Sequence, residues 1–365
     1  MSREARLFFI SVYLLVGLGI VMTYSASAIY AEQVYKNSHH FLIRQIFYAV
    51  LGTVLLFIAA STPADFWRTH SRALILLSIA MLMAVFLPVL GRTAGGAKRW
   101  IRLGVFNFQP AEFAKIAVCL YLSDYLSRKM KFIKKGSIGI FAPPLLLIGI
   151  ICALTLLQPD LGSCAFIFLL SAILFFMAGI RLRYVFLASL VFIPVLYFLV
   201  IREPYRMARM TAYLNPWQDP QGSGFQIIQS FLAFGLGGVK GVGLGLSTQK
   251  LFYLPSSYND FILSVIGEEL GLVGIFFVML LYGILFFCGI QMAERAHHDY
   301  EKFLIVSFTF MIVVQALINM LVATGLVPTK GLPLPFVSFG GTSLAMNLMA
   351  VGFLMGIDRE SRGSR

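Results

Sequence analysis

The chain has 365 residues, of which 59% are hydrophobic and 12% charged, and its mean hydropathy is +0.85. A soluble domain of this size cannot bury so much apolar surface in one core, so lipid must cover much of it. The composition excludes a disordered chain, a fibrous repeat and a small disulfide-rich scaffold. The net charge is +13, from 29 Lys and Arg against 16 Asp and Glu. In a membrane protein such an excess marks cytoplasmic loops and contact with anionic lipid, and no binding to nucleic acid is expected.

Apolar runs of about 20 residues between polar breaks predict ten membrane-spanning helices and therefore an all-α integral membrane protein. The predicted spans are residues 7–28, 41–60, 73–90, 110–126, 138–157, 161–179, 184–201, 262–290, 303–326 and 343–357. With the N-terminus inside, the inner segments hold sixteen Lys and Arg, whereas the short outer loops hold six. Since cytoplasmic loops carry the excess of basic residues, we expect both termini in the cytoplasm. The whole chain, residues 1–365, is expected to form a single membrane domain.

The connection between the seventh and eighth predicted spans, residues 202–261, is a large loop expected on the outer side of the membrane. A connection of this length in a compact chain is usually functional. Its amphipathic stretch 225–234 predicts a short helix at the outer interface. Glycines follow at 235, 237, 238, 241, 243 and 245. They indicate tight backbone turns rather than a nucleotide-binding loop, because no βαβ unit surrounds them.

Ionisable groups inside apolar segments are costly, which makes them candidates for a functional site. Glu112 and Lys115 share a helical face in the fourth span, so they form either a structural ion pair or a phosphate-binding pair. Asp160 follows Pro159 between two spans, where it either caps the sixth helix or joins an outer polar cluster with Lys115. Asp124, near the basic inner loop, is expected to be a solvated residue at a helix end.

Asp260 closes the outer loop directly before an apolar run, a position that suits either helix capping or catalysis. Basic residues on the same side could bind an anionic substrate, because a carboxylate facing a basic surface suits a phosphate-bearing molecule. The candidates for substrate binding, besides Glu112, Lys115 and Asp160, are Arg206, Arg209, Lys250 and Lys330.

Motifs along nearly the whole chain are similar to those of the SEDS family (shape, elongation, division and sporulation), which includes FtsW, RodA and a spore-specific homologue. They are VMTYSAS at 21–27, FQPAEFAK at 108–115, QPDLG at 158–162, YLNPWQDP at 213–220, GSGFQIIQS at 222–230, DF at 260–261, IGEELG at 266–271 and PTKGLPLPFVSFGG at 328–341. The loop most resembles that of FtsW. Two departures are the residues 256–259 before Asp260 and Phe339, where tyrosine is common in the family.

The resemblance implies a ten-helix bundle that polymerises lipid II into β-1,4-linked peptidoglycan strands outside the bacterial cytoplasmic membrane and releases undecaprenyl pyrophosphate. It implies that Asp260 is the catalytic aspartate and that Glu112, Lys115 and Asp160 occupy functional polar positions in a central cavity. It further implies a class B penicillin-binding transpeptidase and other division proteins as partners, and a location at the division septum.

This chemistry agrees with the residues. A glycosidase uses two carboxylates because one must protonate the leaving oxygen. Undecaprenyl pyrophosphate leaves as a stabilised anion, so one carboxylate, Asp260, suffices as general base on the acceptor hydroxyl. Lys115 and the loop arginines would neutralise the pyrophosphate, and a divalent cation, Mg²⁺ or Mn²⁺, could act together with them. The sequence contains no evident carboxylate cage for a metal.

Two other functions fit part of the pattern. A lipid II flippase or transporter would use Glu112, Lys115 and Asp160 as a relay at the membrane midplane, but the sequence has no internal repeat and Asp260 is placed outside. A non-catalytic scaffold for a transpeptidase would tolerate changes at Asp260.

Overall fold

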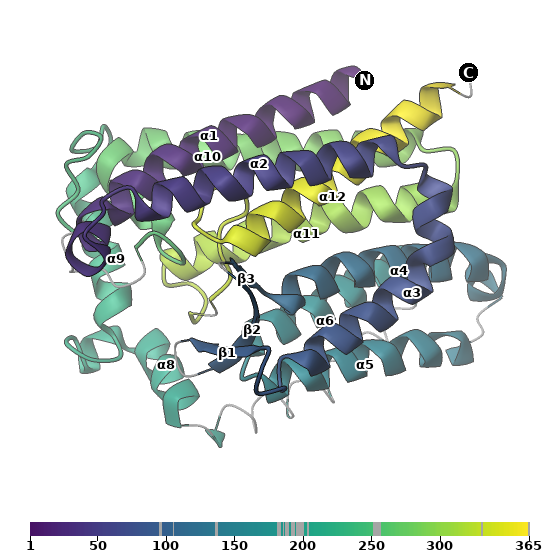
Figure 1. The fold of residues 1–365 in the computed structure, drawn as a ribbon, viewed down its shortest axis with the longest axis horizontal. Coiled ribbons are helices and arrows are strands. Elements are labelled where there is room, and N and C mark those ends of the chain that lie inside the picture. Colours follow the sequence, from purple (N-terminus) through teal and green to yellow (C-terminus); the bar gives the residue numbers. More distant parts are fainter. Residues whose placement is uncertain are drawn as a thin grey trace.

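The computed structural model describes residues 1–94, 97–104, 106–135, 138–180, 184, 186, 190, 194, 201–202, 204–250, 257–329 and 331–363. Long helices dominate this part of the chain (Figure 1). They are α1 (Arg3–Tyr35), α2 (His40–Ser61), α3 (Ala64–Ala84), α4 (Pro110–Lys134), α5 (Ala142–Leu157), α6 (Leu161–Met177), α8 (Pro204–Leu214), α9 (Phe225–Gly237), α10 (Ile262–Arg295), α11 (Asp299–Ala323) and α12 (Gly341–Gly363). Short 3₁₀ turns, η1 (Ile138–Phe141) and η2 (Pro216–Gln218), precede α5 and follow α8.

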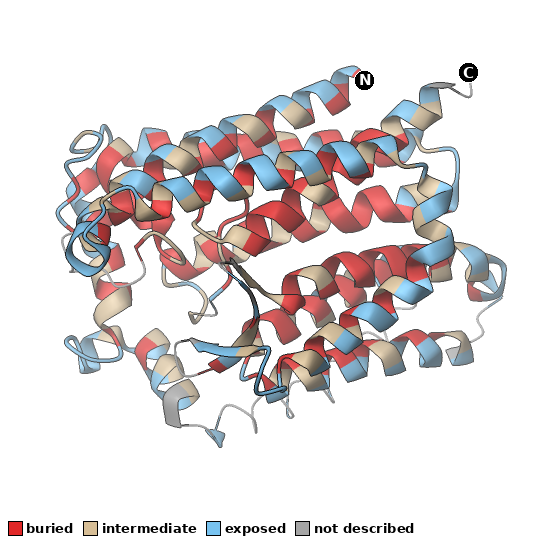
Figure 2. Cartoon of the chain, viewed as in Figure 1, coloured by how far each residue is buried: buried red, intermediate tan, exposed pale blue. Residues whose placement is uncertain are grey.

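Most predicted spans coincide with helices where the structure describes them. The third span, 73–90, overruns α3, which ends at Ala84, and the seventh, 184–201, lies mostly outside the described residues. In the described part of the chain, six helical stretches are long and apolar enough to cross a membrane: α1, α2, residues 139–157, α10, α11 and α12. Their outward faces expose large apolar side chains such as Val50, Phe57, Phe276 and Phe287. Figure 2 shows the opposite pattern inside the bundle, where buried residues line the facing helix surfaces. The protein is therefore a polytopic, mainly helical membrane protein.

The helices form two blocks, with α1, α2, α10, α11 and α12 in one and α3, α4, α5 and α6 in the other (Figure 1). Each block has its own buried apolar cluster, and α4 contributes to both clusters. Small residues allow the closest helix contacts, as expected where lipid supplies no hydrophobic drive. A Cβ atom at Gly352 on α12 would lie 2.3 Å from the carbonyl oxygen of Leu56 on α2.

The two chain ends lie at the same end of the bundle (Figure 1). The backbone N–H of Ser2 donates to Asp358 Oδ2 at 2.8 Å, and Arg295 at the end of α10 contacts Glu4 at 2.6 Å. These contacts join the ends of α1, α10 and α12, so this end of the bundle is held by polar as well as apolar packing.

A three-stranded antiparallel sheet connects α3 to α4, in the order β1 (Gly91–Ala94), β2 (Ala97–Leu103) and β3 (Phe106–Phe108). In the register, Arg92 lies opposite Trp100 and Arg102 lies opposite Asn107. Gly104, with φ of 61°, makes the tight turn between β2 and β3. The sequence analysis did not predict this sheet, because strands of three to seven residues are too short to establish an alternating pattern.

The large loop folds onto the beginning of α10. The predicted short helix is confirmed as α9, and Ser230 on it contacts Ser264 Oγ of α10 and the carbonyl oxygen of Ala323 at the end of α11, both at 2.6 Å. The predicted glycine turns are confirmed at Gly238, Gly241, Gly243 and Gly245, which all have positive φ, whereas the glycines at 235 and 237 lie within α9.

The glycine turns allow backbone to pack on backbone. Helix α10 is interrupted at Gly271, where φ is 67°. A Cβ atom at Gly241 would lie 2.2 Å from the carbonyl oxygen of Glu269, so only glycine permits this approach. The N–H groups of Val242 and Gly243 donate to the carbonyl oxygens of Glu268 and Glu269 at 2.9 and 3.0 Å. The interruption of α10 thus finds its hydrogen-bond partners in the loop.

Candidate active site

Asp260 lies two residues before α10, in a turn whose backbone is held from two directions. Asn319 Nδ2 on α11 donates to the carbonyl oxygens of Asp260 at 3.0 Å and of Leu332 at 2.9 Å. Ser338 Oγ donates to the carbonyl oxygen of Asn259 at 2.6 Å. The main chain of Asp260 is therefore fixed by α11 and by the segment before α12, which positions its side chain.

The carboxylate of Asp260 is half-buried and, among the residues that the structure describes, has no hydrogen bond and no ion pair. Burial raises the pKa of Asp260, while the positive charges of Arg209 and Arg99 oppose that rise. Gly331 leaves space in front of the carboxylate, since a Cβ atom there would lie 3.8 Å from Asp260 Oδ2 and its φ is 66°. An accessible carboxylate with a raised pKa is well suited to accept a proton.

Glu112 and Lys115 form a fully buried ion pair in the first two turns of α4, with 2.8 Å between Lys115 Nζ and Glu112 Oε2. Lys115 Nζ also donates to Gln315 Oε1 on α11 at 2.8 Å and lies 5.3 Å from the ring centre of Phe166 on α6. The pair thus stands where α4, α6 and α11 meet.

A short polar path connects this pair to Asp260. Gln315 Nε2 donates to the carbonyl oxygen of Pro333 at 2.9 Å. The preceding residue, Leu332, accepts a hydrogen bond from Asn319 through its own carbonyl oxygen. Gln315 and Asn319 are four residues apart on α11 and face the same side. The sequence analysis missed both, although two buried amides at helical spacing in an apolar helix were a visible signal.

Asp160 is the N-cap of α6, as one of the two sequence interpretations predicts. Its Oδ1 accepts from the N–H of Ser163 at 3.1 Å, and its Oδ2 accepts from Ser163 Oγ at 2.8 Å. Gln109 Nε2, before α4, donates to Oδ2 at 3.3 Å. Asp160 therefore joins the beginnings of α4 and α6, and no contact with Lys115 appears among the described residues.

Arg99 on β2 is a further cation near the site that sequence reasoning did not single out. Its Nε donates to the carbonyl oxygen of Gln158 at 3.3 Å, and its Nη2 donates to that of Pro159. The guanidinium is thus bound to the two residues that precede Asp160 in the sequence. Its positive charge opposes the rise in the pKa of Asp260 that burial causes. The sheet carries this arginine to the site.

The predicted basic ligands differ in their surroundings. Arg206 and Arg209 lie on α8, and Arg209 Nη1 donates to the carbonyl oxygen of Thr329 at 3.3 Å. Lys250 is buried, and its Nζ contacts Glu269 Oε1 at 2.9 Å, Ser25 Oγ at 3.1 Å and the carbonyl oxygen of Gly245 at 2.6 Å. These three acceptors use all three protons of the ammonium group, so Lys250 fastens the loop. Lys330 lies outside the described residues.

Asp124, expected to be a solvated helix-end residue, is instead buried, so that expectation is wrong. Its oxygens contact Arg128 at 2.6 Å, Ser71 Oγ at 2.9 Å and Arg68 at 3.4 Å. Arg68 and Ser71 on α3 are more than fifty residues away in sequence, so local spacing did not reveal them.

No group of three or more His, Cys, Asp or Glu side chains that could hold a metal ion occurs in the described part of the chain.

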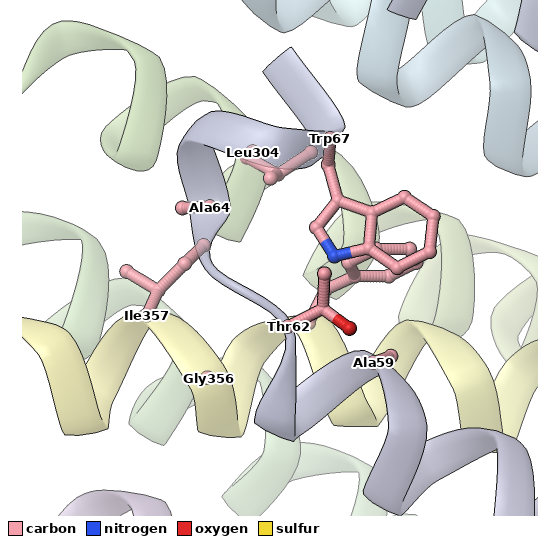
Figure 3. A pocket seen from close by; sticks show the side chains of 8 residues that line it. Ala59, Thr62, Ala64, Trp67, Leu304, Gly356 and Ile357 are labelled. Atoms are coloured by element: carbon pink, nitrogen blue, oxygen red, sulfur yellow. The ribbon is translucent and has the colours of Figure 1, made fainter. Parts of the chain in front are cut away.

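A small cavity lies at the end of the bundle that holds the two termini, beside the connection from α2 to α3 (Figure 3). It is lined by Ala59, Thr62, Ala64, Trp67, Leu304, Phe353, Gly356 and Ile357. Since this lining contains no charged side chain, the cavity does not suit a pyrophosphate, and the candidate site is placed at Asp260.

Comparison with known proteins agrees with the motifs. The family model for FtsW, RodA and SpoVE, described as cell cycle proteins, matches residues 5–363. A probable peptidoglycan glycosyltransferase FtsW from Geobacter sulfurreducens is 44% identical over 346 residues, which cover 95% of this chain and 92% of that protein. Stage V sporulation protein E of Bacillus subtilis is 40% identical over 349 residues, covering 96% and 95%.

Two solved structures share the fold. A chain from a peptidoglycan synthase complex has a TM-score of 0.80 at 28% identity and covers 97% of both chains. RodA of Thermus thermophilus has a TM-score of 0.71 at 26% identity, covering 97% of this chain and 96% of that one. Together, the match over nearly the whole length and the shared fold show that this chain belongs to the FtsW, RodA and SpoVE family of cell cycle proteins, the SEDS family.

Proposed function

We propose that this chain, a peptidoglycan glycosyltransferase, polymerises lipid II with Asp260 as the general base. The observation that supports the role of Asp260 is the environment of its carboxylate. It is half-buried, its main chain is fixed by Asn319, and the described residues give its side chain no hydrogen bond. The assignment of the activity itself rests on relatives named peptidoglycan glycosyltransferase at 41–44% identity.

The reaction needs one proton acceptor. The 4-hydroxyl of the acceptor sugar attacks the anomeric carbon of the donor and gives its proton to Asp260. The new β-1,4 bond forms as the bond to the pyrophosphate breaks, and the electron pair of that bond leaves with undecaprenyl pyrophosphate. One inversion converts the α-linked donor into the β-linked product. A positioned general base contributes about 10²–10⁴-fold to such a rate.

Cations around Asp260 serve the leaving group in this proposal. Arg209 and Arg99 are fixed by backbone carbonyls and act electrostatically on Asp260, so both lie near the pyrophosphate in our assignment. Arg206 on the same helix and Lys330 are further proposed ligands. Lys115, oriented by Glu112, supplies a positive charge from within the bundle. We no longer propose Lys250 as a substrate ligand, because its ammonium group already donates to Glu269, Ser25 and Gly245.

We further propose ten spans with both termini in the cytoplasm, residues 202–261 on the outer side, and residues 1–365 as one membrane domain. The sixteen-to-six bias of Lys and Arg supports this orientation, as does the position of both termini at one end of the bundle. The active site then opens outside the cytoplasmic membrane. The identity to FtsW proteins supports a role at the division septum rather than in elongation.

A class B penicillin-binding transpeptidase is the proposed partner, together with other division proteins. The structural relative belongs to a peptidoglycan synthase complex that coordinates polymerisation and crosslinking, which supports such a pair. We place the contact on the outer loop and on the lipid-facing sides of α10 and α11. Addition of the transpeptidase should raise the polymerisation rate, and an unchanged rate would contradict the pairing.

The proposed function is tested by incubating the purified protein with lipid II and measuring glycan strands and released undecaprenyl pyrophosphate. The wild type should form strands and Asp260→Ala should not. Asp219→Asn is the matched control, because Asp219 is an exposed carboxylate of the same loop. A chelator arm tests the divalent cation: retained activity in excess EDTA supports protein cations alone. Strand formation by Asp260→Ala would contradict the role of Asp260, and movement of lipid II without polymerisation would favour a flippase.

A further inference from the structure

The three-stranded sheet presents basic and aromatic side chains that the proposed mechanism does not use. Arg92 and Trp100 are directly opposite each other, as are Arg102 and Asn107. Arg92 Nη1 donates to Asn107 Oδ1 at 3.1 Å, which places all four on one face of the sheet. Arg92 and Arg102 are exposed and Trp100 is partly exposed. We call Arg92, Trp100 and Arg102 the outer sheet face.

Strand β2 connects this face to the candidate active site. Arg99, next to Trp100, contacts the carbonyl oxygens before Asp160 and acts on Asp260. Ile101 is buried, so the sheet is packed against the helices on its other side. The carbonyl oxygen of Asn107 accepts from Thr342 at 3.1 Å at the beginning of α12. The outer sheet face is thus the exposed side of a sheet whose opposite side carries Arg99 to the candidate site.

The charge of the sheet is unusual for its position. Four of the six basic residues in the short outer loops, Arg92, Lys98, Arg99 and Arg102, fall within eleven consecutive positions. Outer loops are normally depleted of Lys and Arg, so this concentration calls for an anionic ligand on the outer side. A partly exposed tryptophan between two arginines adds a flat apolar surface to the two guanidinium groups.

We infer that the outer sheet face binds the nascent glycan strand as it leaves the active site, an inference that rests on the proposed function. A polysaccharide with peptide side chains presents flat sugar rings and peptide carboxylates at regular intervals. Sugar rings stack on an indole, and guanidinium groups pair with carboxylates in a two-pronged geometry. A phospholipid surface could also take up a tryptophan at the headgroup level, so the test includes an arm with anionic lipid.

The test measures binding of a finished product, so it needs no turnover. The full-length protein is placed in nanodiscs of zwitterionic lipid and titrated with soluble, uncrosslinked glycan strands that carry stem peptides. The same strands with their peptides removed by an amidase form the second probe. The variant is Arg92→Gln/Arg102→Gln. Its matched control is Lys131→Gln/Lys134→Gln, two exposed cations at the far end of α4.

We expect the affinity of the variant for peptide-bearing strands to fall about tenfold, the sum of two exposed charge contacts. The control should bind as the wild type does, and peptide-free strands should bind the wild type and the variant equally. Trp100→Leu should weaken binding of both probes. Polymerisation by Arg92→Gln/Arg102→Gln should begin at the wild-type rate and yield shorter strands.

Unaltered binding of peptide-bearing strands by Arg92→Gln/Arg102→Gln would overturn the inference. So would a variant that binds strands normally but retains less phosphatidylglycerol from mixed-lipid nanodiscs, because the face would then be a lipid surface. If the variant fails to fold, the inference is tested with Arg92→Lys/Arg102→Lys and with a salt titration of strand binding by the wild type. Binding that does not change with salt would contradict the inference. Failure of the proposed function is recognised separately, as absence of polymerisation by the wild type.

Discussion

Three acidic residues near the beginning of α10 have opposite surroundings. Glu268 and Glu269 are fully buried and both accept hydrogen bonds, although Glu269 Oε2 has no partner among the described residues. Glu268 accepts from the N–H and Oγ1 of Thr248 at 2.8 and 2.9 Å, and also from Ser247. Glu269 accepts from Ser25 at 2.6 Å and from Lys250. Asp260, eight residues before Glu268, has no such partner in the described chain.

The contrast separates two uses of a carboxylate. Glu268 and Glu269 hold the large loop against the interrupted part of α10, so their carboxylates serve a structural role. At Asp260, by contrast, α11 and the segment before α12 hold the main chain through Asn319 and Ser338, and the side chain has no hydrogen bond among the described residues. Position in the sequence does not distinguish the three acids, whereas their hydrogen bonds do.

We expect the largest effects from the buried ion pairs, because removing one partner leaves the other charge buried without a counterion. Lys115→Ala should destabilise the protein by about 3–5 kcal/mol and reduce polymerisation, since Glu112 remains unpaired. Lys115→Arg should retain part of the activity, and Glu112→Ala should resemble Lys115→Ala. Thermal unfolding in detergent and lipid II polymerisation measure both effects. In Glu112→Gln/Lys115→Met, stability should return while activity stays low, and a fully active double variant would remove the catalytic role of Lys115.

The second pair should behave differently. Lys250→Met should destabilise the protein by about 3 kcal/mol because Glu269 stays buried without its cation. In Lys250→Met/Glu269→Gln both stability and polymerisation should return, since this pair only fastens the loop. The readouts are again unfolding and polymerisation per folded molecule. A stable double variant without activity would place Lys250 back in the substrate site.

Asp160→Ala should have a smaller effect, a loss of about 1 kcal/mol of stability, because it removes the cap of α6. Asp160→Asn keeps an acceptor for the N–H of Ser163 and should recover most of that loss. Thermal unfolding measures both substitutions. A loss of activity in Asp160→Asn without loss of stability would assign Asp160 a direct role with the substrate.

The pH dependence is the finest test of the comparison. Burial raises the pKa of Asp260. An ionised group with a raised pKa destabilises the folded state above that pKa, and this cost disappears below the unfolded pKa. Asp260→Asn should therefore unfold at an equal or higher temperature than the wild type at neutral pH. The activity of the wild type should fall on the acid side at a higher pH than an ordinary aspartate would give. An Asp260→Asn protein that unfolds earlier at neutral pH would contradict the accessible carboxylate.

Much of the helical frame follows from the sequence, because a span must present about 20 apolar residues to lipid. Local spacing also predicts the Glu112–Lys115 pair and offers the cap at Asp160 as one interpretation. The partners of Lys250, by contrast, are Glu269 and Ser25, 19 and 225 residues away, and no local pattern connects them. The same reason explains the wrong expectation for Asp124. The sheet with Arg99 and the outer sheet face was missed because its strands are too short for a periodic signal.

The central claim is that the Asp260 carboxylate is free to accept a proton, whereas both oxygens of Glu268 on α10 accept hydrogen bonds from the loop. The most direct measurement is the rate of the first glycosidic bond from lipid II, compared per folded molecule for Asp260→Asn and Glu268→Gln. We predict a fall of about 10²-fold or more for Asp260→Asn and a rate within a few-fold of wild type for Glu268→Gln. A wild-type rate for Asp260→Asn would contradict the claim.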